Sequence, residues 1–277
     1  MNFSFIRSLK KLKIYPDSYR DYVFKKQLKN IIMKTVIITG ASTGIGKAIA
    51  QLFLEKGHNL VINSANADNL EATYRELNNA DKVAMVPGDI SLIATGKKLV
   101  ETAVQRFGSA DVLINNAGIF EPKSFLDVEE KDLDLFLNIN LKGTFFTSQS
   151  AVKQMLKQGE GNIINIGTVL VDHAINGFPA TAPISSKGGI HALTRQLAAE
   201  FGKNNIRVNA IAPGIIRSPL QAKTGVDNAD SLAGLHLLNR IGETRDVAEL
   251  ALYLAESNFV TGEIINLDGG HVAGHSI

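Results

Sequence analysis

The chain has 277 residues, 45% of them apolar, so it can bury one sizeable core, and a single α/β domain of this length is common. It contains no cysteine, which excludes disulfide frameworks, thiolate nucleophiles and thiolate metal sites. Its six histidines are scattered without paired ligand spacing, so we expect no metal centre. A chain without cysteine fits a reducing compartment, and we expect a cytoplasmic protein.

The formal net charge of +2 is unevenly divided along the chain. Residues 1–33 carry eight basic and two acidic side chains, whereas residues 34–277 carry 21 basic and 25 acidic ones. Because the body is acidic and residues 1–33 lack a long apolar run, we expect neither a nucleic-acid nor a membrane partner. We interpret residues 1–33 as a basic, poorly ordered extension. A basic amphipathic surface helix, a transit peptide and a start at Met33 are the alternatives.

Short apolar runs alternate with helical patterns from residue 35 onward. Strands are predicted over residues 35–39, 60–63, 83–86, 112–115, 162–166, 207–211 and 263–267. Helices are predicted around residues 45–53, 70–77, 99–107, 133–155, 185–201 and 246–255. This alternation predicts an α/β fold over residues 34–277, a single doubly wound Rossmann-type domain with a parallel sheet of about seven strands. Right-handed crossovers bury both faces of such a sheet.

The first predicted strand ends in TGASTGIG, residues 39–46. Glycines permit a tight turn with close backbone approach, and the N-terminus of the following helix offers unpaired N–H groups to a pyrophosphate. A phosphate-binding P-loop is the competing interpretation, because Lys47 follows the turn. It fails at Ala41 and Ala48, which stand where that loop needs a glycine and a magnesium-binding hydroxyl. A glycine turn that binds no ligand is the third possibility.

Further motifs follow the glycine turn. They are GDIS at 88–91, NNAG at 115–118, NINLKG at 138–143, APG at 212–214 and TGEIINLDGG at 261–270. Together they resemble the short-chain dehydrogenase/reductase family along nearly all of residues 34–277. The resemblance implies an oxidoreductase that uses NAD or NADP on a small-molecule substrate, and a homotetramer or homodimer formed through the long helices.

The resemblance also implies where the dinucleotide binds. In this family an acid after the second strand holds the ribose 2′-hydroxyl of NAD, whereas a basic residue favours the 2′-phosphate of NADP. Here Ser64 and Ala65 are neither, and Thr43 occupies the other basic position, so both cofactors stay open and we lean towards NAD. The resemblance implies that Ser218 binds the nicotinamide carboxamide. A helix N-cap before Pro219 is the alternative role of this serine. The implied cofactor-binding residues are Gly40, Ser42, Thr43, Gly44, Ile45, Gly46, Ser64, Asp89, Ile90, Asn116, Ala117, Gly118, Lys187, Pro213, Gly214, Ile216 and Ser218.

The catalytic set of the family is present only in part. The family uses a tyrosine with a lysine four residues later, a spacing that puts both side chains on one helix face, together with a serine and an asparagine. Asn140, Thr168 and Lys187 match the asparagine, the serine and the lysine. The tyrosine position is Pro183, whose side chain can neither donate, accept nor titrate.

Another group must replace the tyrosine if the chain is an enzyme. Of the five tyrosines, three lie in residues 1–33, and Tyr74 and Tyr253 lie on predicted helices away from the hydride site. His173 is the best substitute by chemistry, since a histidine side chain can exchange protons near neutral pH; a solvent-facing loop histidine is the alternative. Three hydroxyl groups lie nearby in the sequence, but without a neighbouring base they are weak acids. They belong to Thr181, Ser185 and Ser186.

Two functional hypotheses stay open at this point. The first is an oxidoreductase that transfers hydride between a nicotinamide cofactor and a small carbonyl or alcohol, with a non-standard proton donor. The second is a catalytically silent dinucleotide-binding protein with a regulatory or assembly role. The loop over residues 169–183, with two prolines and several small residues, is predicted to form a rebuilt wall of the substrate site.

Overall fold

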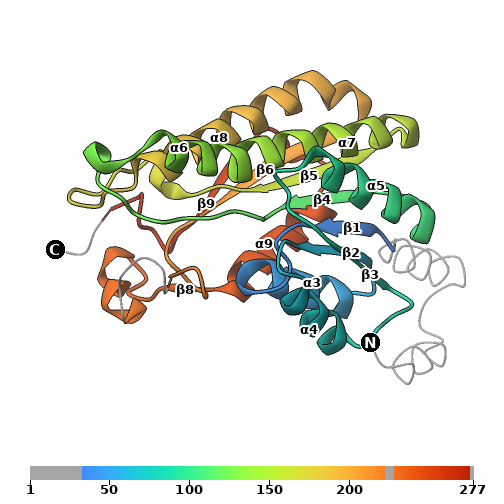
Figure 1. Cartoon of the computed structure of the whole chain (residues 1–277), viewed down its shortest axis with the longest axis horizontal. Coiled ribbons are helices and arrows are strands. Elements are labelled where there is room, and N and C mark those ends of the chain that lie inside the picture. Colours follow the sequence, from blue (N-terminus) through green and yellow to red (C-terminus); the bar gives the residue numbers. More distant parts are fainter. Residues whose placement is uncertain (1–32, 222–227, 275–277) are drawn as a thin grey trace, which may run out of the picture. The chain divides into compact units, whose positions relative to one another are not determined.

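A computed structural model describes residues 33–221 and 228–274 of the chain (Figure 1). The predicted N-terminal extension lies outside these described residues, apart from Met33. Lys34 begins the compact domain that carries the rest of the described chain. None of the helices in the described ranges combines the length and the apolar content that a membrane span requires.

Seven parallel strands form the central sheet in the order β3-β2-β1-β4-β5-β6-β9. The chain starts in the middle of the sheet, runs outward to β3, returns to β4 and then runs outward to the other edge (Figure 1). This order confirms the predicted doubly wound sheet and puts the switch point between β1 and β4. The strands are β1 (Thr35–Ile38), β2 (Asn59–Ser64), β3 (Val83–Pro87), β4 (Val112–Asn115), β5 (Gly161–Ile166), β6 (Ile206–Pro213) and β9 (Ile264–Leu267).

Helices cover both faces of the sheet (Figure 1). One face carries α3 (Gly44–Glu55), α4 (Ala67–Leu77) and α9 (Thr244–Glu256). The other face carries α5 (Ile93–Phe107), α7 (Gly143–Gln158) and α8 (Thr181–Phe201), and the short α6 (Glu130–Phe136) packs against α8.

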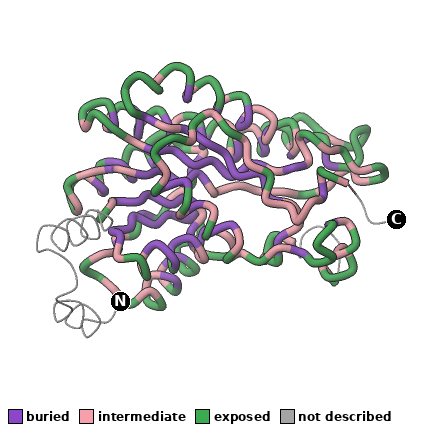
Figure 2. The backbone as a smooth tube through the Cα atoms, turned by 180° about the vertical axis from the view of Figure 1, so that it is seen from behind, coloured by how far each residue is buried: buried purple, intermediate pink, exposed green. Residues whose placement is uncertain are grey.

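The apolar run of β1 explains this layering. Val36 and Ile38 belong to one hydrophobic core, whereas Ile37 belongs to the other, and all three are 0% exposed. Successive side chains of a strand point to opposite faces, so a strand that is covered on both sides needs an unbroken apolar sequence. Figure 2 shows the buried strands at the centre of the domain and exposed positions on the outer sides of the helices.

Three local features differ from the prediction. The helix predicted over residues 133–155 is interrupted, because α6 ends at Phe136 and a π-helical turn, Leu137–Lys142, leads into α7. Helix α8 begins at Thr181, earlier than predicted, since Pro183 fits a first turn in which N–H groups have no intrahelical partner. The parallel pair β7 (Ile216–Arg217) and β8 (Gly242–Glu243) is too short to leave a periodic signal.

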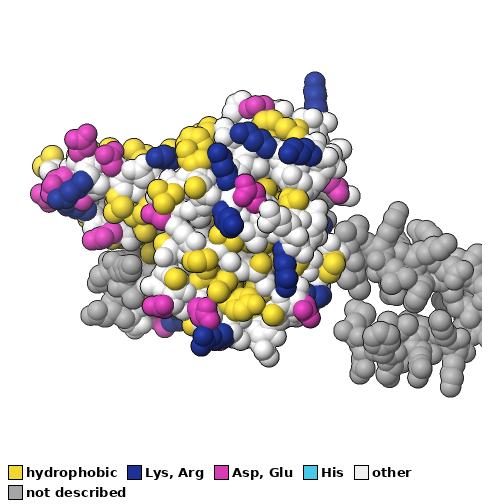
Figure 3. Space-filling view, turned by 45° about the vertical axis from the view of Figure 1, so that its right-hand side comes forward, with side chains coloured by type: hydrophobic (Ala, Val, Ile, Leu, Met, Phe, Trp, Pro, Cys, Tyr) yellow, Lys and Arg dark blue, Asp and Glu magenta, His cyan; other side chains and the backbone are white. Residues whose placement is uncertain are grey.

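Charge is mixed over the surface that Figure 3 shows. On this face lysine and arginine side chains lie among acidic and apolar ones. Several basic side chains form ion pairs with acids of the same domain, including Arg75 with Glu71 and Arg245 with Glu249. On the face shown, side chains of the two signs are therefore interspersed.

Phe53 provides a test of the core around β1. Its ring is 0% exposed in the core that α3 and α9 share, so Phe53→Ala is expected to lower the free energy of unfolding by about 3–5 kcal/mol through lost burial and an unfilled cavity. The matched control is Phe259→Ala, because Phe259 is 96% exposed and its removal is expected to change the stability by less than about 0.5 kcal/mol. Denaturant unfolding of both variants measures the difference, and equal effects would contradict this account of the core.

Candidate functional site

The turn after β1, residues 39–46, is called the glycine cradle here, because positions 40 and 46 leave no room for a side chain. Gly40 has φ +64°, and a Cβ atom there would lie 2.8 Å from the Cα of Ala117. A Cβ at Gly46 would lie 2.2 Å from the carbonyl oxygen of Gly40, so the start of α3 packs directly on the turn. Thr43 makes no side-chain capping hydrogen bond to α3, and the first turn of α3 has no acidic residue. An uncapped helix N-terminus behind a glycine cradle fits the pyrophosphate of a dinucleotide.

Two polar side chains hold this cradle against the end of β4. The amide nitrogen of Asn116 donates to the carbonyl oxygens of Thr39 and Gly40, each at 3.0 Å. The hydroxyl of Thr39 accepts from the backbone N–H groups of Asn116 and Ala117, again at 3.0 Å. The turn after β1 and the NNAG segment are therefore one hydrogen-bonded unit.

The end of β2 carries hydroxyls rather than charges. The hydroxyl of Ser42 donates to that of Ser64 at 2.9 Å, and the backbone N–H of Asn66 donates to Ser64 at 3.2 Å. At the end of β3, the carboxylate of Asp89 accepts from the N–H of Ser91, and Asp89 itself is exposed. The predicted adenine-side residues thus lie on adjacent strand ends, and their polar groups suit a ribose or an adenine edge.

Lys187 is half-buried next to the end of β5. Its Nζ donates to the carbonyl oxygen of Ile166 at 2.7 Å, and burial lowers the pKa of Lys187 to about 8. A Cβ at Gly118 would lie 3.3 Å from this Nζ and 3.1 Å from the Oδ1 of Asn140. Glycine at position 118 therefore lets the NNAG segment pass close to both predicted catalytic side chains.

Asn140 lies in the π-helical turn between α6 and α7, and it is 0% exposed. Its carboxamide accepts from the N–H of Ile119 at 2.8 Å and donates to the carbonyl of Ile119 at 3.1 Å and to Ser186 at 2.9 Å. Ser186 in turn donates to the carbonyl oxygen of Pro183 at 2.7 Å. π-Helical turns occur frequently at functional sites. This one places Asn140 between the residue that follows the NNAG segment and the start of α8.

A cavity of about 310 Å³ lies at the carboxyl edge of the sheet. Nine of the predicted site residues line it: Ile45, Asn116, Gly118, Thr168, Lys187, Pro213, Gly214, Ile216 and Ser218. The rest of its wall is mostly apolar and includes Ile119, Phe120, Val169, Leu170, Ile175, Phe178, Leu220, Leu232 and Leu235. The predicted wall loop over residues 169–183 supplies four of these side chains. The cavity therefore joins the nicotinamide end of the predicted cofactor site to an apolar chamber.

Pro183 does not bring chemistry to this cavity. It is buried at the third position of α8 and does not line the cavity. Of the tyrosines in the described part of the chain, Tyr74 packs against the core that contains α3, and Tyr253 is 56% exposed on α9. The nearby hydroxyls do not line the cavity either, and they belong to Thr181, Ser185 and Ser186.

His173 lies next to a second histidine that sequence reasoning missed. The ring of His173 meets the ring of His271 edge to face, with centroids 5.0 Å apart, and His271 lines the cavity whereas His173 does not. The ring of His236 also lies near that of His271, with centroids 5.4 Å apart. His271 follows the matched motif at residues 261–270 by one position, so only its place in the chain could have pointed to it. In the described ranges, no group of three or more histidine or acidic side chains is placed to hold a metal ion.

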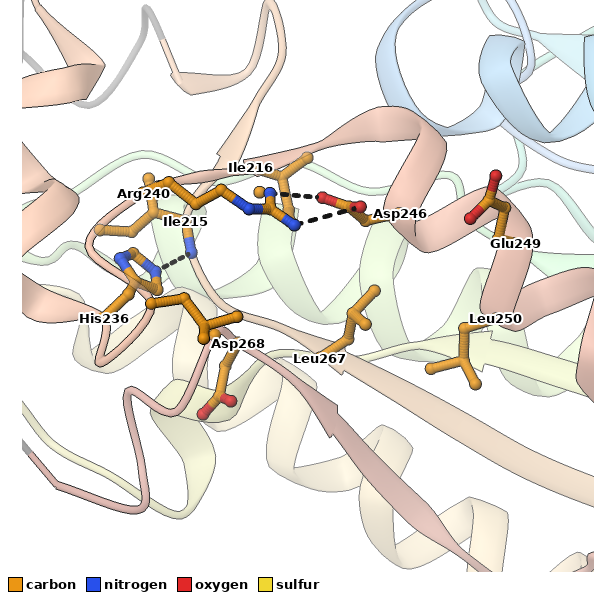
Figure 4. A pocket seen from close by; sticks show the side chains of 12 residues that line it. Ile215, Ile216, His236, Arg240, Asp246, Glu249, Leu250, Leu267 and Asp268 are labelled. Atoms are coloured by element: carbon orange, nitrogen blue, oxygen red, sulfur yellow. Dashed lines mark hydrogen bonds and ion pairs between the residues drawn. The ribbon is translucent and has the colours of Figure 1, made fainter.

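A second cavity, of about 290 Å³, lies behind Ile215 and Ile216, which line both cavities (Figure 4). The Nε2 of His236 accepts from the N–H of Ile215 at 3.3 Å and so supports the loop after β6. Across this cavity, Arg240 pairs with Asp246 at 2.8 Å (Figure 4). The side chains that line this cavity therefore help to hold the loop after β6 in place.

A family model described as enoyl-(acyl carrier protein) reductase matches residues 40–272, which cover the cradle, the cavity and most of the sheet. The chain belongs to the short-chain dehydrogenase/reductase family. It is 36% identical over 249 residues to 3-oxoacyl-(acyl-carrier-protein) reductase FabG of Thermotoga maritima, covering 86% of this chain and 98% of that protein. It is 37% identical over 246 residues to L-rhamnose-1-dehydrogenase of Scheffersomyces stipitis, covering 86% and 95% respectively.

Solved structures of the family agree with this fold. ElxO with NADP bound has a TM-score of 0.81 and 30% sequence identity, covering 88% of this chain and 100% of that one. The structure of gox2181 has a TM-score of 0.83 and 25% identity, covering 89% and 99%. These relatives support a nicotinamide cofactor for this family member. They do not support the expected lean towards NAD, because the ElxO structures hold NADP and NADPH.

The buried amine of Lys187 has a consequence for stability. Its pKa is lowered from 10.5 to about 8, so between these values the unfolded chain binds more protons than the folded one, and stability from this group rises with pH. Below pH 8 the buried ammonium costs on the order of 3 kcal/mol, partly offset by its bond to Ile166. Lys187→Met is therefore expected to raise the melting temperature at pH 7, with a gain that shrinks between pH 8 and 10.

Thermal unfolding of parent and variant at pH 7, 8, 9 and 10 measures this gain. The exposed Lys98 on α5 provides the matched control, and Lys98→Met should follow the parent at every pH. A constant difference between parent and Lys187→Met across the series would contradict the lowered pKa of Lys187.

Proposed function

We propose that this short-chain dehydrogenase/reductase transfers hydride between NAD or NADP and a small carbonyl or alcohol, with a proton donor other than tyrosine. The observation that carries the proposal is that Thr168, Lys187 and the turn at residues 213–214 line one cavity. A lysine with only a structural role would bring no benefit to offset the cost of burying its ammonium. Groups with perturbed pKa values that converge in a pocket are typical of active sites.

The predicted cofactor-binding residues would hold the dinucleotide along the edge of the sheet. The uncapped start of α3 suits the pyrophosphate, and Ser42 and Ser64 suit the adenine ribose. Lys187 would donate to the nicotinamide ribose, and Ser218 to the carboxamide. When bound, the nicotinamide supplies or accepts the hydride. NAD and NADP both remain in the proposal, because the end of β2 offers hydroxyls to either.

Thr168 and the histidines would serve the substrate oxygen. The hydroxyl of Thr168 accepts from the N–H of Leu170 at 3.3 Å, so its own hydrogen can be donated to that oxygen. His173 is the proposed source of the exchanged proton, and the contact between its ring and that of His271 supports a route to the cavity. Asn140 would act as a positioning residue that holds the start of α8.

Pro183 favours the second candidate, a catalytically silent dinucleotide-binding protein, because it removes the proton donor on which the family relies. Two further predictions stay proposals. A homotetramer or homodimer would use the long helices α7 and α8, and Phe145 and Leu156 are exposed on α7. A cytoplasmic location rests on the absence of cysteine.

Dinucleotide binding followed by a carbonyl and alcohol screen tests the two candidates. Thermal shifts with the oxidised and reduced forms of NAD and NADP are expected to show binding, since a ligand that binds only the folded state raises its stability. Nicotinamide absorbance should then change with at least one substrate, and Lys187→Met should reduce this rate by roughly 10²-fold or more. Binding without turnover over a broad panel would favour the silent protein. The absence of binding would overturn both.

The histidine pair is tested by His173→Ala and His271→Ala, singly and together. Loss of a general acid is expected to lower kcat by roughly 10²-fold, and the double variant should be no slower than the slower single one because the two rings share one route. His173→Ala should leave the dinucleotide thermal shift intact, since His173 does not line the cavity. An unchanged kcat in both single variants would remove the pair from the mechanism.

A further inference from the structure

The side of the cavity away from the cofactor turn is apolar. Ile119 and Phe120, which follow the NNAG segment, line this side. Ile175 and Phe178 of the wall loop and Leu235 of the segment before β8 complete the lining there. These side chains come from three separate parts of the chain, so the apolar surface is a built feature of the site rather than one local run. Ligand pockets use such surfaces to bury the non-reacting part of a substrate.

Two phenylalanines define the shape of this wall. The rings of Phe120 and Phe178 lie nearly parallel, with centroids 5.9 Å apart and planes 13° apart. The N–H of Lys123 donates to the carbonyl oxygen of Pro179 at 2.7 Å, so the two segments that carry the rings are hydrogen-bonded next to them. Parallel rings present edges and faces against which a further ring packs well. The wall is therefore both apolar and fixed in position.

Charged groups are nearly absent from the lining. Among the described residues that line the cavity, Lys187 and His271 are the titratable ones, and the lining includes no arginine or carboxylate. The ammonium of Lys187 donates to Ile166, and the proposed function assigns its remaining donors to the nicotinamide ribose. A phosphate or carboxylate on the substrate would therefore lose its hydration without gaining a dedicated partner. A polyol would bury several hydroxyls against side chains that cannot hydrogen-bond, which is costly.

The size of the chamber limits the substrate further. The cavity volume of about 310 Å³ is at the lower end of the roughly 300–1,000 Å³ that is typical of ligand pockets. Part of this volume borders Pro213, Gly214 and Ser218, where the nicotinamide would lie. The remainder suits a compact molecule with one polar reacting group.

We infer that the substrate is an uncharged ketone, or the matching secondary alcohol, whose carbon bears a compact apolar group, preferably an aryl ring seated against Phe120 and Phe178. This inference rests on the proposed function. In reduction, the carbonyl carbon gains a hydride from the reduced cofactor and the oxygen gains one proton that ultimately comes from water, which yields the secondary alcohol and the oxidised cofactor. The apolar wall contributes binding, and Thr168 meets the oxygen.

A panel matched in size tests the substrate class. It contains an aryl methyl ketone, a cyclohexyl methyl ketone, an aldose, an aryl 2-oxo acid and an acyl thioester of coenzyme A. The aryl ketone is expected to have a kcat/KM at least about 10²-fold above that of the aldose and of the oxo acid, because polar groups are left unpaired in the apolar chamber. Equal or faster turnover of the aldose, the oxo acid or the thioester would overturn the inference.

Direct binding gives a readout that does not depend on turnover. Calorimetry should detect 1-phenylethanol binding to the protein saturated with reduced cofactor, a combination that cannot react. Phe178→Ala is expected to weaken this binding about tenfold or more, and Phe178→Leu should weaken it less while favouring the cyclohexyl over the aryl ketone. The control Phe259→Ala, at a fully exposed position, should match the parent.

The outcomes separate this inference from the proposed function. Turnover of some carbonyl without aryl preference would keep the proposed function and overturn the inference. Cofactor binding with neither turnover nor binding of the aryl alcohol would overturn both. Equal affinities of the parent and Phe178→Ala for the aryl alcohol would overturn the inference that the aryl ring binds against Phe120 and Phe178.

Discussion

The hydrogen bonds that join Thr39 and Asn116 are the constraint on which the site depends. They tie the ends of β1 and β4 together at the point where the order of the sheet reverses, with four contacts of 3.0 Å. A doubly wound sheet opens at this point, because the helices that follow the two strands lie on opposite faces. These hydrogen bonds keep the glycine cradle and the NNAG segment at a fixed separation, and the proposed dinucleotide site and the cavity both lie next to them.

The proposed catalytic end of the site combines this fixed frame with Lys187, whose ammonium is costly to bury. Lys187 is kept in place by Ile166 and by the close passage of Gly118, while burial opposes its charge. A group of this kind lowers the stability of the fold and raises the precision of the site, a compromise that is common where function needs a strained or desolvated residue. Asn140 and Ser186 secure the same region by hydrogen bonds that leave Asn140 fully buried.

Sequence patterns predicted the sheet, the order of helices and the family, because unbroken apolar strands and glycine motifs leave strong local signals. Sequence patterns failed where a feature has no periodicity or depends on contacts between distant residues. The π-helical turn at residues 137–142 has no periodicity of its own, so the long helix was predicted as continuous. The role proposed for His271 depends on a ring contact with His173, 98 positions away in the sequence, which no spacing rule predicts. The stacking of Phe120 on Phe178 is of the same kind.

Pro183 occupies one of the few helix positions at which a residue without an N–H disturbs nothing. The first intrahelical bond near it runs from Ile184 to Ala180, and the start of α8 is complete without a donor at position 183. In the proposed function, the residue at position 183 therefore decides the proton donor without affecting the geometry of α8. On this proposal, selection can exchange that residue for chemical reasons alone, and the scaffold proposed to hold the cofactor needs no redesign.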